Sequence, residues 1–347
     1  MKAATASALG FPVGDQLVTD GADTIVSTNP ANGSTNHQVV VAQPRHVDLA
    51  VEAASAAADK HWQSMLPHVR ARILARIGDE LESNAERLAT IQMRENGKVY
   101  RECVAQAHAA ADVFRYFAAV CEVTGSDVTP PRGPYLSLVE HEPYGVVAAL
   151  TPWNSPLTME AQKVAPALAA GNAVILKPSE TTPTTAIELA VLALKADLPP
   201  GLLNVLPGRG DVGASLVSHP GVRMVSFTGG TETGRTVGQA AARRLVPAAL
   251  ELGGKSPHIL FEDADLDTAI DAVVSGIFEG SGQSCVAGSR LFVEQGAYDQ
   301  VVSAVVARAR ALRVDLPDVP GAEMGPLASF SHRTRVEATV AGAVSDG

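Results

Sequence analysis

The stretch of sequence that decides the fold is residues 145–176, which read GVVAALTPWNSPLTMEAQKVAPALAAGNAVIL. Two short apolar runs, residues 146–150 and 173–176, flank an Ala-rich segment with helical spacing near residues 157–168. A continuous apolar run of this length is typical of a strand buried on both faces, and a helix between two such strands favours parallel pairing. The stretch therefore predicts a strand–helix–strand unit of a parallel sheet.

The same alternation continues beyond residue 176. Helices are predicted near residues 184–195 and 212–218, and strands over residues 203–206 and 224–227. A further α/β stretch begins near His258. The fold class is therefore α/β, with a parallel sheet wrapped by helices and a ligand expected at the carboxyl ends of the strands.

The N-terminal part of the chain follows other patterns. Residues 11–44 contain short strand candidates separated by turn residues and predict an edge meander; the candidates are 11–18, 24–28 and 38–41. Residues 47–123 have the spacing of Ala-rich helices, with a helix stop predicted at residues 96–98 (NGK). Residues 135–142 are a strand candidate with prolines on both sides, which indicates a separate small sheet.

Length and composition indicate an ordinary globular protein. The 347 residues exceed the size of a typical domain, which predicts two or three domains. Hydrophobic residues make up 46% and charged residues 18% of the chain, a mix typical of helix-rich α/β proteins. The net charge of −10 disfavours binding to nucleic acid and to anionic membranes. A small molecule is therefore the expected partner.

The cysteines and the N-terminus indicate a cytoplasmic protein. Cys103, Cys121 and Cys285 are too few and too scattered for a disulfide framework or a zinc site, so we predict no metal. The first residues are too polar for a secretory signal, which leaves a signal peptide as a weak alternative. No uncharged run reaches the roughly 18 residues of a membrane span.

Two glycine-rich loops follow consecutive strand candidates. Residues 208–213 read GRGDVG, the pattern of a dinucleotide-binding turn, but the acidic residue expected at the end of the next strand is absent. That strand instead ends in residues 227–235 (FTGGTETGR), where Gly229, Gly230 and Thr231 can offer free N–H groups at a helix N-terminus. We favour the second loop for phosphate binding. A turn that only needs glycine is the alternative for either.

Another strand end carries two residues suited to a nucleotide ribose. The strand at residues 173–176 is followed by residues 177–180 (KPSE). Lys177 can donate to ribose or phosphate oxygens, and Glu180 can accept from a ribose 2′-hydroxyl but would repel a 2′-phosphate. NAD is therefore favoured over NADP. The alternative is a surface lysine beside an acidic residue at a helix N-terminus.

Three further segments carry groups suited to carbonyl chemistry. Cys285 lies among small residues that permit close approach of a substrate, although most lone cysteines are small buried hydrophobic residues. Glu251 ends an apolar strand before two glycines, where burial would raise its pKa toward that of a general base. Asn154 is held between prolines at the end of another strand and can donate to an oxyanion.

With these motifs, the chain resembles the NAD(P)-dependent aldehyde dehydrogenase superfamily from Phe11 to its last residue. The resemblance rests on local motifs that occur in the family's order: residues 152–156 (PWNSP), 177–180, 227–235, 250–257 (LELGGKSP) and 282–290 (GQSCVAGSR). It implies a Rossmann-type cofactor domain followed by an α/β catalytic domain. It also implies that residues 208–213 are a connecting turn.

The resemblance assigns the chemical roles. Cys285 would attack an aldehyde to give a thiohemiacetal, Asn154 and the Cys285 N–H would hold the oxyanion, and Glu251 would activate the water that hydrolyses the thioester. The product would be a carboxylic acid. The residues implied in cofactor binding are Trp153, Lys177, Glu180, Gly229, Gly230, Thr231, Gly234 and Leu252.

The resemblance also implies domain boundaries and an assembly. Residues 1–131 would be the N-terminal strands and helices of the cofactor domain, 132–143 a bridging strand for oligomerisation, 144–252 the NAD-binding sheet and 253–347 the catalytic domain. A homodimer or homotetramer is expected for the complete protein.

The chain departs from the family pattern in several places. Ser155 replaces a frequent aromatic residue, Gly230 replaces a frequent serine, and the family's E-x-F-G-P motif is absent. Residues 333–343 read as a helix that runs into the start of a loop. We therefore expect an incomplete catalytic domain and a fragment of a longer product, with a catalytically impaired, cofactor-binding remnant as the alternative function. The competing enzyme class is a cysteine hydrolase that pairs Cys285 with a histidine such as His258.

Overall fold

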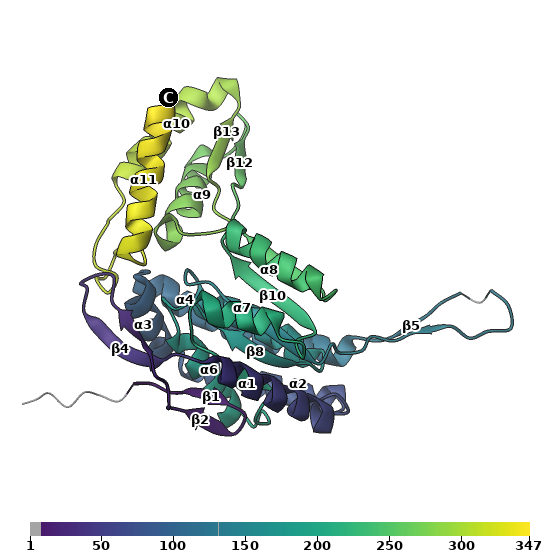
Figure 1. The fold of residues 1–347 in the computed structure, drawn as a ribbon. Helices are drawn as coiled ribbons and strands as arrows, with labels where there is room; N and C mark the ends of the chain where they lie inside the picture. The colour runs from purple at the N-terminus through teal and green to yellow at the C-terminus, as the bar shows by residue number, and fades with distance from the viewer. Residues whose placement is uncertain (1–7, 131) are drawn as a thin grey trace, which may run out of the picture.

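The computed structural model describes residues 8–130 and 132–347 and places a five-stranded parallel sheet at the centre of the molecule (Figure 1). The strands run in the order β11-β10-β7-β8-β9. They are β7 (Val146–Leu150), β8 (Ala173–Lys177), β9 (Leu203–Val205), β10 (Met224–Gly229) and β11 (Ala248–Leu252). The predicted parallel α/β sheet is therefore confirmed, with most strands within two residues of their predicted bounds.

The direction of the chain across the sheet reverses once. From β7 it proceeds through β8 to β9 on one side, and then returns to place β10 and β11 on the other side of β7. The register pairs Leu150 with both Lys177 and Phe227, so the carboxyl ends of β7, β8 and β10 lie at one edge. In open α/β sheets such a switch point forms the ligand-binding crevice.

Helices cover both faces of this sheet because their apolar stripes need a partner surface. One face carries α1 (Pro44–Ala57), α7 (Gly210–Ser218) and α8 (Thr231–Arg243). The other face carries α5 (Pro156–Ala169) and α6 (Thr184–Lys195), which are backed by α2 (Pro67–Ser83), α3 (Ala85–Asn96) and α4 (Tyr100–Val123). One large hydrophobic core runs through the sheet and the N-terminal helices, and a small separate cluster lies between α3 and α4.

A smaller second unit follows β11 and lies above the sheet in Figure 1. It contains the parallel pair β12 (Pro257–Leu260) and β13 (Arg290–Val293), with helices α9 (Leu266–Phe278), α10 (Tyr298–Arg310) and α11 (Phe330–Asp346). Its own small core includes Ile270, Val274 and Val301.

The remaining strands form three antiparallel ribbons apart from the main sheet. They are β1 (Phe11–Val13) with β2 (Gln16–Val18), β3 (Thr24–Thr28) with β4 (Thr35–Val40), and β5 (Asp127–Val128) with β6 (Leu138–Val139). The predicted single strand over residues 11–18 is wrong, because Gly14 adopts φ +62° and turns the chain into a hairpin. The predicted edge meander is also wrong, since β1–β2 and β3–β4 are two separate ribbons. The strand expected over residues 135–142 shortens to β6, in a small sheet of its own as predicted.

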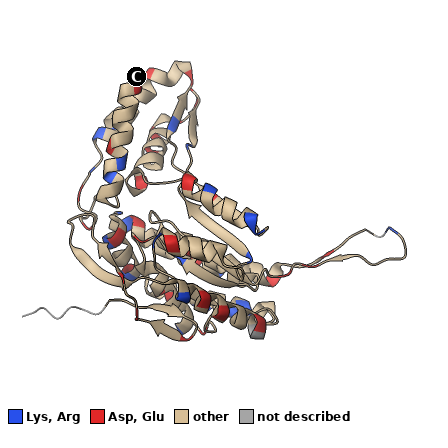
Figure 2. Ribbon diagram, in the orientation of Figure 1, with Lys and Arg blue, Asp and Glu red and all other residues tan. Residues whose placement is uncertain are grey.

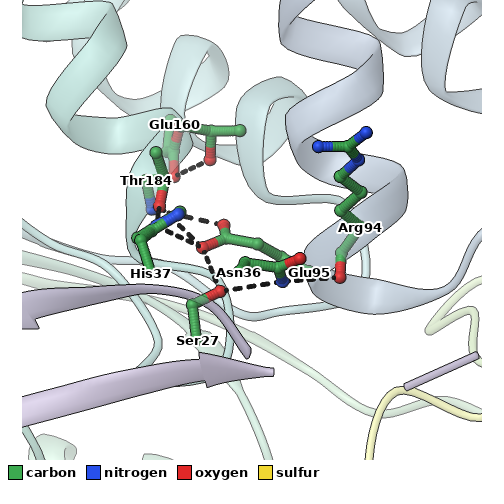
Figure 3. A network of polar contacts seen from close by, with 8 residues as sticks. Ser27, Asn36, His37, Arg94, Glu95, Glu160 and Thr184 are labelled. Carbon is green, nitrogen blue, oxygen red and sulfur yellow. Dashed lines mark hydrogen bonds and ion pairs between the residues drawn. The ribbon is translucent and has the colours of Figure 1, made fainter. Parts of the chain in front are cut away.

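A buried carboxylate holds the end of α3 in place (Figure 3). Glu95 is only 1% exposed, and its Oε1 accepts hydrogen bonds from the Ser27 hydroxyl at 2.9 Å and from the Thr184 hydroxyl at 2.6 Å. The Nε2 atom of His37 lies 3.6 Å from the same oxygen. Because a buried carboxylate is costly unless it is hydrogen-bonded, these contacts fix α3 against β3 and α6. The helix then stops where predicted, at Gly97, which is left-handed with φ +75°.

Acidic and basic residues are scattered over the helices of both units (Figure 2). In the described part of the chain, no helix is both long enough and apolar enough to cross a membrane.

Candidate active site

Asn154 lies in the loop that leaves β7 at the switch point. This loop, residues 151–155, is here called the Asn154 loop, and it ends where Pro156 starts α5. The Asn154 side-chain nitrogen donates to the carbonyl oxygen of Gln283 at 2.7 Å. Because an amide has two N–H donors, this bond fixes the direction of the amide and leaves the second N–H for a ligand.

Cys285 lies in the segment that follows α9. This segment, residues 279–289, is here called the Cys285 loop, and its second to fourth residues, Gly280, Ser281 and Gly282, have positive φ. A left-handed conformation is strained for serine, so the surroundings must enforce it. The Gly280 N–H donates to Glu102 at 2.9 Å and the Ser281 hydroxyl donates to the Gly325 carbonyl at 2.9 Å. These bonds tie the loop to α4 and to the segment before α11.

The cysteines differ in accessibility. Cys103 and Cys121 are buried, and burial raises the pKa of the Cys103 thiol to about 12. Cys285 is partly exposed. A nucleophilic thiol must be reachable by its substrate and able to ionise. Cys285 is therefore the candidate nucleophile on geometry alone.

Glu251 lies in β11, at the edge of the sheet next to β10. Its predicted burial is wrong, because β11 is the edge strand of the sheet that the structure describes and the side chain is exposed. The segment that follows β11 nevertheless lies against Cys285, because a Cβ atom added at Gly254 would lie only 2.7 Å from the Cys285 carbonyl oxygen. Glycine at this position is what permits the close approach of the two segments.

A lysine that the sequence analysis did not select lies near Glu251. Lys163 of α5 is buried, and its ammonium group donates to the Ser226 hydroxyl at 3.0 Å. Burial lowers the pKa of Lys163 to about 8, and the negative charge of Glu251 partly opposes this shift. Lys163 can be identified only from the structure, because no sequence motif marks a lysine within an Ala-rich helix.

A cleft of about 850 Å³ opens at the switch point. The carboxyl ends of β7, β8 and β10 form its floor, and α7, α8 and the start of α11 form its walls. The predicted cofactor residues that line it are Trp153, Lys177, Glu180, Gly229 and Gly230. Thr231, Gly234 and Leu252 lie outside the lining. A Cβ atom at Gly234 would lie 2.4 Å from a methyl carbon of Leu252, so this glycine allows β11 to pack against α8.

The two candidate ribose-binding residues meet the cleft differently. Lys177 is buried, and its ammonium group donates to the Pro178 carbonyl at 2.8 Å. Burial lowers the pKa of Lys177, whereas the nearby carboxylates of Glu180 and Asp211 raise it. The Glu180 side chain is exposed at the rim of the cleft.

Both glycine-rich loops reach this cleft. Gly229 and Gly230 precede the first turn of α8, and Gly210 and Gly213 belong to α7. At Gly230 an added Cβ would meet no atom within 4 Å, which leaves open space beside the helix N-terminus. The unpaired N–H groups of a first helical turn favour an anion.

The structure adds residues from α11 that the sequence analysis missed. His332 and Arg335 line the cleft, and the His332 ring lies 4.9 Å from the Trp153 ring. The Nδ1 atom of His332 and the hydroxyl of Thr151 are buried and have no hydrogen-bond partner in the described part of the chain. Both can therefore bind a ligand in the cleft. No sequence motif marks these residues, because α11 lies far from β7 along the chain.

The sequence model of the aldehyde dehydrogenase family matches residues 17–347. The chain belongs to the aldehyde dehydrogenase family. This aldehyde dehydrogenase is 40% identical over 346 residues to phenylacetaldehyde dehydrogenase of Pseudomonas fluorescens, and the match covers 96% of this chain and 69% of that protein.

Solved structures agree with this assignment. The fold matches the NAD⁺ complex of an aldehyde dehydrogenase from Bacillus cereus with a TM-score of 0.94 at 35% identity, covering 98% of this chain and 70% of the other. It matches an NADP-dependent enzyme of E. coli with the same TM-score of 0.94 at 34% identity, covering 98% and 71%. The protein is thus an oxidoreductase of a family that oxidises aldehydes with NAD(P).

Proposed function

We propose that this aldehyde dehydrogenase oxidises an aldehyde to a carboxylic acid through a thioester on Cys285, with NAD as its preferred cofactor. One observation carries the proposal: the 2.7 Å bond from Asn154 to the Gln283 carbonyl, which joins the loop after β7 to the loop of the accessible thiol. The bond joins Asn154 to the loop that carries Cys285, and Trp153, the neighbour of Asn154, lines the cleft of nucleotide size.

The first step belongs to Cys285. Its thiolate attacks the aldehyde carbon, which forms a C–S bond and moves the carbonyl π electrons onto oxygen. The second N–H of Asn154 and the backbone N–H of Cys285 stabilise this oxyanion. Since the Gln283 carbonyl already orients the amide, little reorganisation is needed when the charge develops.

NAD(P), when bound, supplies the acceptor for the hydride that leaves the former aldehyde carbon. Loss of the hydride leaves a thioester on Cys285. Glu251 then removes a proton from the water that attacks this thioester. The thiolate of Cys285 is then the leaving group, and the carboxylic acid is released.

The cleft fits a dinucleotide on observations independent of any relative. Its volume of about 850 Å³ lies in the range of ligand pockets. The open N-terminus of α8 suits a pyrophosphate, and Lys177 and Glu180 suit a ribose. Thr151 and His332 contribute buried polar atoms that lack a partner within the described chain.

The competing hydrolase is not supported by the position of His258. This histidine belongs to β12, and its ring packs against Gly276 and Gly288, where an added Cβ would lie 2.9 Å and 1.8 Å from it. Its Nε2 atom has no hydrogen-bond partner among the described residues, Cys285 included. A general base must lie within hydrogen-bond reach of its nucleophile.

We also propose that the complete protein assembles as a homodimer or homotetramer. The β5–β6 ribbon extends far from the sheet (Figure 1), and the side chains of Leu138 in β6 and of Tyr135 and Leu136 just before it are exposed. Exposed apolar residues of this kind favour an interface with another subunit.

The domain boundaries are a further part of the proposal. We propose that residues 1–131 and 144–252 form one cofactor domain, which the shared core supports, and that residues 253–347 belong to the catalytic domain.

The cofactor preference is tested by comparing kcat/KM for NAD and NADP with hexanal and benzaldehyde as probes. We expect NADH and the acid in equal amounts, and a preference for NAD of about tenfold or more, because the Glu180 carboxylate repels a 2′-phosphate. Replacing Glu180 by glutamine should reduce this ratio. Replacing Glu188, a half-buried carboxylate of α6 that pairs with Arg87 at 2.8 Å and does not line the cleft, should not. Hydrolysis of an ester probe such as 4-nitrophenyl acetate without any NAD-dependent oxidation of the aldehydes would support the hydrolase instead. An unchanged ratio in Glu180→Gln would show that Glu180 does not set the cofactor preference. NAD binding without oxidation would favour the cofactor-binding remnant.

A further inference from the structure

Two buried side chains hold both neighbours of Asn154. The Asn96 side-chain nitrogen donates to the carbonyl oxygen of Trp153 at 3.3 Å. The Lys98 ammonium group donates to the hydroxyl of Ser155 at 3.2 Å, and the Gln106 amide donates to the same oxygen at 3.1 Å. The Asn154 loop is therefore hydrogen-bonded one residue before and one residue after Asn154, whose amide the proposed reaction needs.

Asn96 and Lys98 are themselves held in place by burial and packing. Asn96 is 2% exposed and Lys98 is 8% exposed, and the Asn96 side-chain oxygen accepts the Lys98 N–H at 3.0 Å. Between them, a Cβ atom at Gly97 would lie 2.8 Å from Pro326 and 2.9 Å from Pro30, so the backbone there is packed from two sides. The adjacent Glu95 is held by Ser27 and Thr184 (Figure 3). Residues 95–98 thus form a rigid anchor.

We propose that Asn96 and Lys98 are positioning residues that set the direction of the Asn154 amide toward the oxyanion. The inference rests on the proposed function, because it assumes that Asn154 is the oxyanion donor. Donors of this kind are effective only when they are preorganised, and a displacement of about 1 Å can cost on the order of 100-fold in rate. The Gln283 bond fixes the amide from the thiol side, and residues 96–98 fix its backbone from the opposite side.

The structure offers a matched control for Asn96. Asn172, which is 3% exposed, accepts the Gly145 N–H at 3.0 Å with its side-chain oxygen and donates to the Ala167 carbonyl at 3.1 Å. Its bonding pattern equals that of Asn96, but it lies at the amino ends of β7 and β8, on the opposite edge of the sheet from Asn154. At either site, replacing asparagine by aspartate keeps the side-chain oxygen that accepts and removes the side-chain N–H that donates.

The experiment is a double-mutant cycle that follows the rate of the first NADH burst with hexanal and NAD. The variants are Asn96→Asp, Asn154→Ala, both together, and Asn172→Asp with and without Asn154→Ala. Thermal midpoints are recorded for each. Ser155→Ala is the second probe, because Ser155 makes no side-chain cap to α5 and the change removes only the acceptor of Lys98 and Gln106.

We expect Asn154→Ala to slow the burst by about 100-fold to 1,000-fold. Asn96→Asp should slow it about tenfold or more and Ser155→Ala several-fold in the parent, but both changes should have less than a twofold effect once Asn154 is alanine. Asn172→Asp should lower the thermal midpoint as Asn96→Asp does and leave the burst within twofold of the parent.

Two results would overturn the positioning role: a burst at the parent rate in Asn96→Asp, or an equal slowing by Asn96→Asp with and without the Asn154 side chain. If Asn96→Asp does not fold, the same comparison with Ser155→Ala decides the question. A normal burst in Asn154→Ala would instead refute the oxyanion role of Asn154 in the proposed function, and the positioning role with it.

Discussion

Replacing Cys285 by alanine is expected to abolish aldehyde oxidation while NAD binding stays nearly unchanged. The covalent route has no nucleophile without the thiolate, whereas the cleft residues that fit the cofactor lie on other elements. Oxidation is measured as NADH and acid formation with hexanal. Cofactor binding is measured by titration calorimetry and by the fluorescence of Trp153, which lines the cleft.

Cys103→Ala is the matched control for this prediction. Cys103 is a buried thiol with a pKa raised to about 12, so its loss should cost some stability and leave the turnover near that of the parent. Residual oxidation in Cys285→Ala above a few per cent of the parent would refute the covalent mechanism. A parallel loss of NAD binding would show instead that the substitution disturbs the whole cleft.

Replacing Glu251 by glutamine is expected to allow one burst of NADH and then to stop turnover. Hydride transfer precedes hydrolysis of the thioester, so loss of the general base stalls the enzyme at the second half-reaction. Stopped-flow absorbance should show a burst close to one NADH per active site, followed by a steady rate lowered by about 100-fold to 10,000-fold.

Glu232→Gln is the control, because Glu232 is an exposed carboxylate in the first turn of the neighbouring helix α8. It should keep both phases. If burst and steady state fall together in Glu251→Gln, then Glu251 acts earlier, by activating Cys285.

The sheet could be predicted from the sequence because three of its strands, β7, β8 and β9, are buried on both faces. Apolar runs such as residues 146–150 and 173–176 have no other stable placement between helices, and α6 begins and ends at the predicted residues 184–195. The N-terminal ribbons could not be predicted to the same extent. Their strands are short and half exposed, so a single left-handed glycine, Gly14, decides between one strand and a hairpin.

The candidate site divides in the same way. Lys177 and Gly229 end strands β8 and β10, and Asn154 follows β7, so their convergence at one edge was predictable from the topology. The roles of Asn96, Lys163 and His332 were not predictable. Their position depends on packing between segments that lie more than 50 residues apart in the chain, and such packing leaves no local pattern.

Intact-mass analysis of Glu251→Gln after mixing with hexanal and NAD tests the central claim most directly. If Cys285 carries the reaction, the protein gains the mass of one hexanoyl group, peptide mapping places it on Cys285, and the amount of adduct equals the NADH released. Cys285→Ala treated in the same way should gain no mass. NADH release without an acyl group on Cys285 would contradict the account.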